Sequence, residues 1–431
     1  MPDPISFTVH NTSGHARTGR VETPHGGFDT PAFMPVGTRG TVKGIFPHHV
    51  RSTGAEILLN NTYHLMLRPG SKLIQEMGGV HKFINWDGPI LTDSGGYQAY
   101  SMADLNAIDE DGVSFKSILD GSTIRLTPEI AIQVQNELGP DIIMAFDDCP
   151  PSVDPDVGPT NQVRIKQAAL RDSMKKKGYD HNARLEVANE RTVRWLERCK
   201  AAHANPDNQA LFGIIQGGTD FDRRDWCLER ICNIDLPGYA IGGVAVGETS
   251  ADIARVVRHT APKMPAHKPR YLMGVGYDRD ITAAVLAGVD MFDCVLPTRN
   301  GRNANAFTAD PTTDGQLRLR NAKFAQDESP IEQGCDCPAC DPASHGWATY
   351  DARPFSRAYI RHLFIAGEML GPILVTLHNL RFFQRLMDDL RHAINTDEWG
   401  AFKIKRPSLR RSWTMPLPSD PRARRCSGFA C

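Results

Sequence analysis

Eight short apolar runs recur along the first 293 residues, and polar or glycine-containing turns follow them. Most runs are almost continuously apolar, as expected of parallel strands that are covered on both faces. Amphipathic stretches such as Pro128–Leu138, Ala188–His203 and Ser250–Thr260 lie between several of them. The runs are Pro31–Pro35, Ile57–Asn60, Ile90–Thr92, Ile142–Phe146, Leu211–Ile215, Tyr239–Val246, Tyr271–Val275 and Met291–Asp293.

Eight β/α repeats over roughly 250–300 residues are typical of a (β/α)8 barrel. A doubly wound open sheet is the alternative, because periodicity alone does not separate the two folds. We predict an α/β protein whose main domain, residues 1–302, is a (β/α)8 TIM barrel. Enzymes with this fold carry their chemistry at the carboxyl ends of the strands.

The composition and the N-terminal residues indicate a large globular protein and give no sign of a membrane span or a secretory signal. The 431 residues are 41% hydrophobic, enough for one large domain with an insertion. No stretch approaches 18 uninterrupted apolar residues, so no membrane span is expected. The N-terminus, MPDPISFTVH, lacks a basic region and an apolar core, so no secretory signal is expected. Together with ten mostly scattered cysteines, this predicts a cytoplasmic protein.

Three of the cysteines, Cys335, Cys337 and Cys340, form a C-x-C-x-x-C motif. Three thiols within six residues predict one structural zinc ion, which needs a fourth ligand. His345, His362 and His378 are the candidates, and spacing alone leaves the choice open. We therefore predict a zinc-binding subdomain near the C-terminus.

That subdomain, with closing helices, is expected over residues 303–395. A basic, Pro- and Arg-rich tail, partly disordered, is expected over residues 396–431. Three polar segments read as insertions: Ser152–Asp180, Asp310–Gly334 and Asp341–Phe355.

Three aspartates, Asp93, Asp147 and Asp293, directly follow or end apolar runs. In a barrel these side chains converge at one mouth, where opposed carboxylates suit the chemistry of a glycosidic bond. One carboxylate attacks or stabilises the anomeric carbon, and another handles the proton of the leaving group. The alternatives are structural ion pairing and, for Asp93, capping of the helix that follows it.

Amide and glycine groups follow other runs. Gln216 and the turn at Gly243 offer donors and acceptors for the edge of a purine, and Tyr97 offers an aromatic face for a base. Plain βα turns are the alternative for the glycines.

Arg299 and Arg302 come just after Asp293, in what reads as a loop broken by Gly301. The net charge is −1, but residues 291–431 hold 19 basic against 15 acidic residues, and the remainder 30 against 35. A nucleic-acid partner that meets the C-terminal side is therefore expected.

Several of these motifs together resemble one family, the tRNA-guanine transglycosylases of bacterial type, over about residues 5–395. They are NNTYHLMLRPG, LTDSGGYQ, MAFDDC, GIIQGG, IGGVAVGE, YLMGVG, FDCVLPTRNGRNA, and C-x-C-x-x-C followed by SRAYIRHLF and TLHN. The resemblance implies a zinc-containing (β/α)8 barrel. Its activity is the exchange of guanine at the wobble position of GUN-anticodon tRNAs for 7-aminomethyl-7-deazaguanine (preQ1), in queuosine biosynthesis.

The resemblance also implies a role for each site residue. Asp293 corresponds to the nucleophile and Asp93 to the general acid/base. The base contacts correspond to Asp147, Gln216, Gly243, Tyr97, Met273 and Cys149; the RNA contacts correspond to Arg299 and Arg302; and the zinc ligands correspond to Cys335, Cys337, Cys340 and His378.

Finer features follow from the same resemblance. Cys149 and Val246 match the subtype that takes preQ1 rather than queuine. A homodimer is implied, although the long segment between Cys340 and Ser356 alters the region that family dimers use. Asp148 departs from the pattern, because a glutamate is usual there.

Two other functions compete. A non-catalytic partner subunit of such an enzyme loses key carboxylates, whereas Asp93, Asp147 and Asp293 are all present. A sugar hydrolase leaves the arginines and the cysteine motif unexplained.

Overall fold

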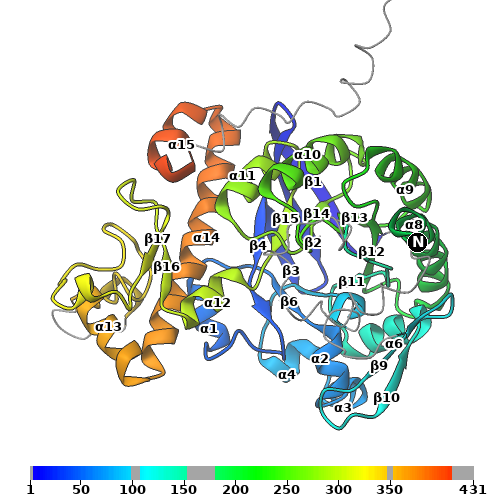
Figure 1. Cartoon of the computed structure of the whole chain (residues 1–431), viewed down its shortest axis with the longest axis horizontal. Coiled ribbons are helices and arrows are strands. Elements are labelled where there is room, and N and C mark those ends of the chain that lie inside the picture. Colours follow the sequence, from blue (N-terminus) through cyan, green and yellow to red (C-terminus); the bar gives the residue numbers. More distant parts are fainter. Residues whose placement is uncertain (1–2, 99–106, 153–179, 347–352, 410–431) are drawn as a thin grey trace, which may run out of the picture.

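The computed structural model describes residues 3–98, 107–152, 180–346 and 353–409. Its centre is a ring of parallel strands (Figure 1). They are β4 (Ala32–Met34), β5 (Val36–Gly37), β6 (Leu58–Asn60), β7 (Ile90–Thr92), β11 (Ile142–Met144), β12 (Ala210–Ile215), β13 (Gly238–Ile241), β14 (Arg270–Leu272) and β15 (Met291–Asp293). Each of the eight predicted runs overlaps one of these strands, and β5 directly follows the first run.

The ring closes at its first strand. Pro35 separates β4 from β5, and these two halves pair on opposite sides, β4 with β15 and β5 with β6. The predicted (β/α)8 barrel is therefore confirmed, and the open sheet is excluded.

Helices surround the ring. They are α1 (Pro47–Ser52), α2 (Thr62–Leu67), α3 (Ser71–Glu76), α4 (Gly79–Ile84), α6 (Pro128–Leu138), α8 (His181–Ala202), α9 (Phe221–Asn233), α10 (Ser250–Thr260) and α11 (Asp278–Val285). Local sequence explains their limits: Thr127 caps the first turn of α6, Pro128 opens it, and Gly139 ends it with φ of 71°. No helix in the described ranges is long and apolar enough to cross a membrane.

An antiparallel sheet that the sequence analysis missed closes the amino end of the barrel. It comprises β1 (Ser6–Ser13), β2 (Ala16–Thr23) and β3 (Gly26–Thr30). Val21 and Phe28 are fully buried in the same apolar cluster as Phe212 of the barrel. Arg17 of β2 forms a buried ion pair with Asp290, which immediately precedes β15. This sheet does not cover the carboxyl end of the barrel.

A second small sheet, also not predicted, lies between β7 and α6 in the sequence. Its strands are β8 (Ala107–Ile108), β9 (Val113–Lys116) and β10 (Thr123–Leu126), and neighbouring strands are antiparallel.

Most of the expected insertion Ser152–Asp180 falls outside the described residues, as do residues 347–352 of the expected insertion Asp341–Phe355.

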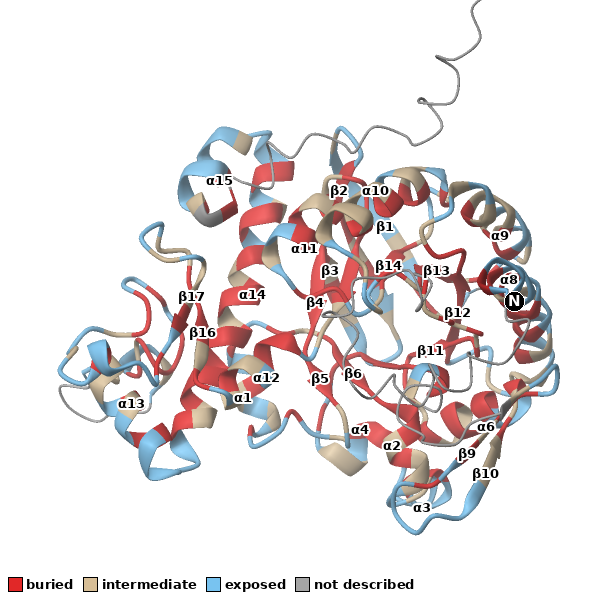
Figure 2. Cartoon of the chain, in the orientation of Figure 1, coloured by how far each residue is buried: buried red, intermediate tan, exposed pale blue. Residues whose placement is uncertain are grey.

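The C-terminal part is built on one long helix, α14 (Leu370–Thr396). It lies between the barrel and a group formed by β16 (Asn305–Phe307), β17 (Gln316–Arg318) and α13 (Arg357–Ala366) (Figure 1). Much of α14 is buried (Figure 2). Short 3-10 helices are also present at Ala261–Lys263, Ala322–Phe324, Ala343–His345 and Pro407–Leu409.

The expected tail, 396–431, begins in regular structure. Helix α15 (Trp399–Lys405) packs on α14 through Phe402, which is buried in the main core. Residues 410–431 lie outside the described part.

The arginines after Asp293 do not lie in a loop, so that prediction was wrong. They belong to helix α12 (Leu296–Arg302), which Pro297 opens. Gly301 does not break the helix but lets it cross α14 closely. A Cβ atom at this position would lie 2.8 Å from the backbone nitrogen and Cα of Thr376.

We predict that Gly301→Ala lowers thermal stability, because the added methyl group forces α12 and α14 apart. Overpacking of this kind costs about 1–3 kcal/mol. Gly400→Ala is the matched control, since Gly400 is also helical but has no atom within 4 Å of the position that a methyl group would take. It should be neutral or stabilising, by up to about 1 kcal/mol. Equal melting temperatures for both variants would contradict this role of Gly301.

Candidate active site and metal centre

The three predicted aspartates all lie at the carboxyl end of the barrel. Asp93 directly follows β7, Asp147 comes shortly after β11, and Asp293 is the last residue of β15. The charge of Asp293 contributes to raising the pKa of Asp93, and the charge of Asp93 to raising that of Asp147. The structure thus brings together the three carboxylates that the sequence pattern selected.

Asp93 is fixed by three donors. Its carboxylate accepts hydrogen bonds from the Asn61 amide, from Gln98 Nε2 at 2.7 Å and from the backbone N–H of Thr62 at 2.9 Å. Thr62 begins α2, and within the described residues no backbone N–H of the helix that follows Asp93 donates to its carboxylate. Burial outweighs these donors and raises the pKa of Asp93 to about 6. A carboxyl group with this pKa can both give and take a proton near neutral pH.

Asp293 is held through one oxygen only. Its Oδ1 accepts hydrogen bonds from Tyr271 Oη at 2.6 Å and from the backbone N–H of Gly274 at 2.7 Å. Within the described residues, Oδ2 accepts none. Burial holds the pKa of Tyr271 well above its usual value, so the phenol stays a donor. The arrangement orients a carboxylate whose second oxygen is available to react.

Adjacent aspartates have opposite surroundings. Asp148 is buried and pairs with Arg184 at 2.6 and 2.9 Å and with Arg191 at 2.6 Å. Asp147 instead accepts a side-chain hydrogen bond from Gln216 Nε2 at 2.6 Å, and no cationic side chain of the described residues pairs with it. Burial, followed by the charge of Asp148, raises the pKa of Asp147 to about 7 despite that bond. Asp148 is therefore structural, whereas Asp147 faces the site.

The glycine turns at the site have a physical reason. Gly243 adopts φ of +64°, and a Cβ atom there would lie 2.2 Å from Gln216 Oε1. Arg224 of α9 is fully buried and donates to the carbonyl oxygens of Ile215, Gly218 and Gly242, each at 2.8 Å. Sequence reasoning missed Arg224, because an arginine in a polar helix carries no signal of burial.

The remaining predicted base contacts lie near the same rim. Tyr97 follows Asp93 and is 44% exposed, so its ring is accessible. Met273 follows β14 and is half-buried. Cys149 follows Asp148, and burial raises the pKa of its thiol.

The two predicted RNA contacts lie on α12. Arg299 is exposed, and Arg302 is half-buried. Burial and the charge of Arg299 lower the pKa of Arg302. Both side chains belong to the last turns of the helix, which begins three residues after Asp293.

Cys335, Cys337, Cys340 and His378 converge in a buried cluster. The three sulfur atoms lie 3.6, 3.4 and 3.6 Å from His378 Nδ1. Tetrahedral zinc with usual Zn–S and Zn–N bond lengths places sulfur and nitrogen about 3.6 Å apart. The donor set therefore fits a metal ion of this kind. Of the three candidate histidines His378 is in the cluster, whereas His345 is half-buried and its Nε2 contacts the carbonyl oxygen of Asp336 instead.

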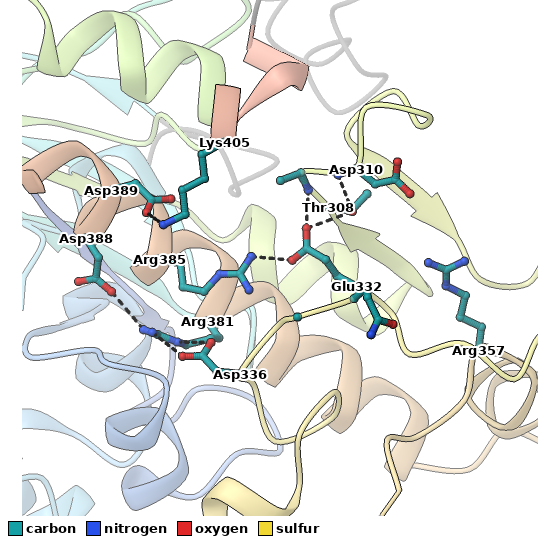
Figure 3. A pocket seen from close by; sticks show the side chains of 13 residues that line it. Thr308, Asp310, Glu332, Asp336, Arg357, Arg381, Arg385, Asp388, Asp389 and Lys405 are labelled. Atoms are coloured by element: carbon teal, nitrogen blue, oxygen red, sulfur yellow. Dashed lines mark hydrogen bonds and ion pairs between the residues drawn. The ribbon is translucent and has the colours of Figure 1, made fainter. Parts of the chain in front are cut away.

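Ion pairs from α14 hold the cysteine segment in place (Figure 3). Arg381 binds Asp336, between two of the cysteines, at 2.8 and 2.9 Å. Arg385 binds Glu332 at 2.7 Å, and Glu332 accepts the backbone N–H of Ala309 at 2.6 Å. These side chains line a cavity of about 670 Å³ in which opposite charges are paired. Sequence reasoning did not find this network.

Comparison with known proteins agrees with this geometry. The sequence model of one protein family, described as Queuine tRNA-ribosyltransferase, matches residues 12–177 and 167–411. The chain belongs to this family. The expected resemblance is thereby confirmed.

Curated relatives of the same description match nearly the whole chain. The protein from Symbiobacterium thermophilum is 49% identical over 398 residues, 92% of this chain and 88% of the relative. One from Thermus thermophilus is 47% identical over 417 residues, 96% of each chain. That from Idiomarina loihiensis is 47% identical over 391 residues, 91% of this chain and 93% of the relative.

Neutralising Asp147 should stabilise the protein in a pH-dependent manner. The pKa of Asp147 is raised from 3.8 to about 7, so the unfolded chain ionises first and the contribution of this group to wild-type stability falls as the pH rises from about 4 to 7. Asp147→Asn removes this loss. Its gain in melting temperature should therefore be larger at pH 8 than at pH 5. Asp148→Asn is the control and should lower the melting temperature at both pH values, because it breaks a buried ion-pair cluster.

Cys337→Ser should reduce bound metal and lower the melting temperature, because a structural site contributes folding free energy directly. Cys232→Ser, outside the cluster, should do neither. Metal analysis by mass spectrometry and thermal denaturation are the measurements. Wild-type protein purified without any bound metal would contradict the assignment.

Proposed function

We propose that this protein exchanges the wobble guanine of GUN-anticodon tRNAs for preQ1, as a tRNA-guanine transglycosylase in queuosine biosynthesis. The observation that carries the proposal is the group of three carboxylates at the barrel mouth, of which Asp93 is buried and Asp147 and Asp293 are half-buried. In the described residues, no lysine or arginine pairs with Asp93, Asp147 or Asp293. Each of these carboxylates is therefore available to a substrate, in a chain that belongs to the family.

In the first half-reaction, Asp293 Oδ2 attacks C1′ of the ribose. The C1′–N9 bond breaks, and an ester-like bond links Asp293 to the tRNA. Asp93 gives its proton to the departing guanine. Its raised pKa, about 6, makes the protonated form accessible near neutral pH.

The second half-reaction runs in reverse with another base. Asp93, now ionised, takes the proton from N9 of preQ1. That nitrogen attacks C1′, and the bond to Asp293 breaks. The carboxylate is regenerated, and retention at C1′ follows from two inversions.

Recognition of the base uses the remaining groups of the rim. The Asp147 carboxylate accepts from N1–H and the 2-amino group, and these donors favour its ionised form. Gln216 and the backbone N–H of Gly243 donate to O6. Tyr97 and Met273 sandwich the ring, and Cys149 with Val246 leaves room for an aminomethyl group but not for queuine.

The tRNA is held by α12. Arg299 and Arg302 bind the phosphates of the anticodon loop, close to the nucleophile in the sequence. We also propose that the Cys335–Cys337–Cys340–His378 site holds one structural zinc ion and that the protein acts in the cytoplasm.

We also propose that the protein forms a homodimer. Tyr359 and Ile365 of α13 and Met369 before α14 are 42%, 60% and 79% exposed, so apolar surface is available around Ser356–His362. Association through this surface would cover it.

The direct test is incubation with radiolabelled guanine and unmodified tRNA, followed by competition with preQ1 or queuine. We expect guanine to enter the tRNA and preQ1 to compete far better than queuine. A non-catalytic subunit would give no exchange, and a sugar hydrolase would release guanine without incorporating another base.

Asp293→Asn should abolish the denaturant-resistant enzyme–tRNA adduct, because the amide keeps the shape but is not a nucleophile. Tyr271→Phe is the control: it removes only the donor to Oδ1 and should still form the adduct, more slowly. Gel electrophoresis of enzyme and labelled tRNA measures both. An adduct in Asp293→Asn would assign the nucleophile to another residue.

A further inference from the structure

Asn379 of α14 is fully buried and uses its side-chain amide three times. Its Nδ2 donates to the carbonyl oxygens of Pro297 at 2.9 Å and Asn305 at 3.0 Å. Its Oδ1 accepts the backbone N–H of Phe307 at 2.9 Å. One side chain thus ties the start of α12 to β16.

The next residue back along α14 is the metal ligand His378. Its Nδ1 faces the cysteines, and its Nε2 lies 2.7 Å from the carbonyl oxygen of Phe307. A metal-bound histidine usually donates its other nitrogen in this way, which fixes the ring. Phe307 is therefore held at its N–H by Asn379 and at its carbonyl by His378.

Contact between the helices reinforces the link. Gly301 of α12 packs against Thr376, which is three residues before Asn379. Pro297, whose carbonyl Asn379 binds, lies four residues after Asp293 and five before Arg302. The placement of the two arginines thus depends on the helix that carries the metal ligand.

We propose that Asn379 is a positioning residue for tRNA binding: it transmits the geometry of the metal centre on α14 to the arginine helix α12. The inference rests on the proposed function of Arg299 and Arg302. None of the groups that receive the purine contacts Asn379, so free-base binding is independent of it.

The chain offers a matched control in Gln384. It lies on the same helix, is also buried, and donates one hydrogen bond, Nε2 to the carbonyl oxygen of Phe33 in β4 at 3.0 Å. Both residues are buried amides that bind backbone carbonyls. Only Asn379 binds the segment that contains the arginines.

The experiment measures dissociation constants of the metal-loaded protein for unmodified tRNA, by filter binding, and for preQ1, by calorimetry. Asn379→Ala should weaken tRNA binding roughly tenfold, the effect of losing a buried hydrogen bond, and leave preQ1 binding and metal content unchanged. Asn379→Leu, which keeps the volume, should behave likewise. Arg302→Ala should also weaken tRNA binding, whereas Gln384→Ala should not.

Two results would overturn the inference. Wild-type-like tRNA binding by both Asn379 variants, while Arg302→Ala binds weakly, would remove the link between α14 and α12. Equal loss of tRNA and preQ1 binding would show general disruption instead. Absence of base exchange by the wild type contradicts the proposed function alone, because tRNA affinity is measured without turnover.

Discussion

Closure of the parallel sheet between β4 and β15 sets the geometry on which the site depends. Because every strand in the ring runs in the same direction, all carboxyl ends lie on one rim. Residues from β7, β11, β12 and β15 that are distant in sequence meet there. The β1–β3 sheet covers the opposite end of the barrel.

The rim differs electrostatically from the rest of the interior. Elsewhere, buried carboxylates have cationic partners: Asp148 has Arg184 and Arg191, and Asp290 has Arg17. Among the described residues, Asp93 and Asp147 have only neutral donors, and burial raises the pKa of each. Holding unpaired carboxylates costs stability, as is usual for groups kept for catalysis. In the proposed mechanism, Asp93 gives the proton that it retains as a result to the leaving base.

The barrel and its rim residues were predictable because buried parallel strands and their turns leave a strong local pattern. The C-x-C-x-x-C motif was equally clear, although spacing did not choose His378. The helix at Leu296–Arg302 was missed because Gly301 was taken as a break; its close contact with Thr376 is visible only in three dimensions. The β1–β3 sheet was missed because β1 is largely exposed and polar.

Buried polar residues on helices were the main features that the sequence did not predict. Arg224, Asn379 and the Arg381–Asp336 pair shape the site or its support, but each makes its contacts with residues that are distant in the sequence or with backbone atoms. Periodicity assigns such side chains to solvent. Helix α14 illustrates the consequence: its apolar positions were recognisable, whereas its role in joining metal centre, arginine helix and barrel was not.

A crystal structure with preQ1 bound tests the central claim most directly. The account predicts that the base lies at the barrel mouth between Tyr97 and Met273, with N1–H and the 2-amino group on Asp147 and O6 on Gln216 and Gly243. Its N9 should point toward Asp93 and the free Oδ2 of Asp293. A base bound elsewhere, or one whose N9 faces away from both carboxylates, would contradict it.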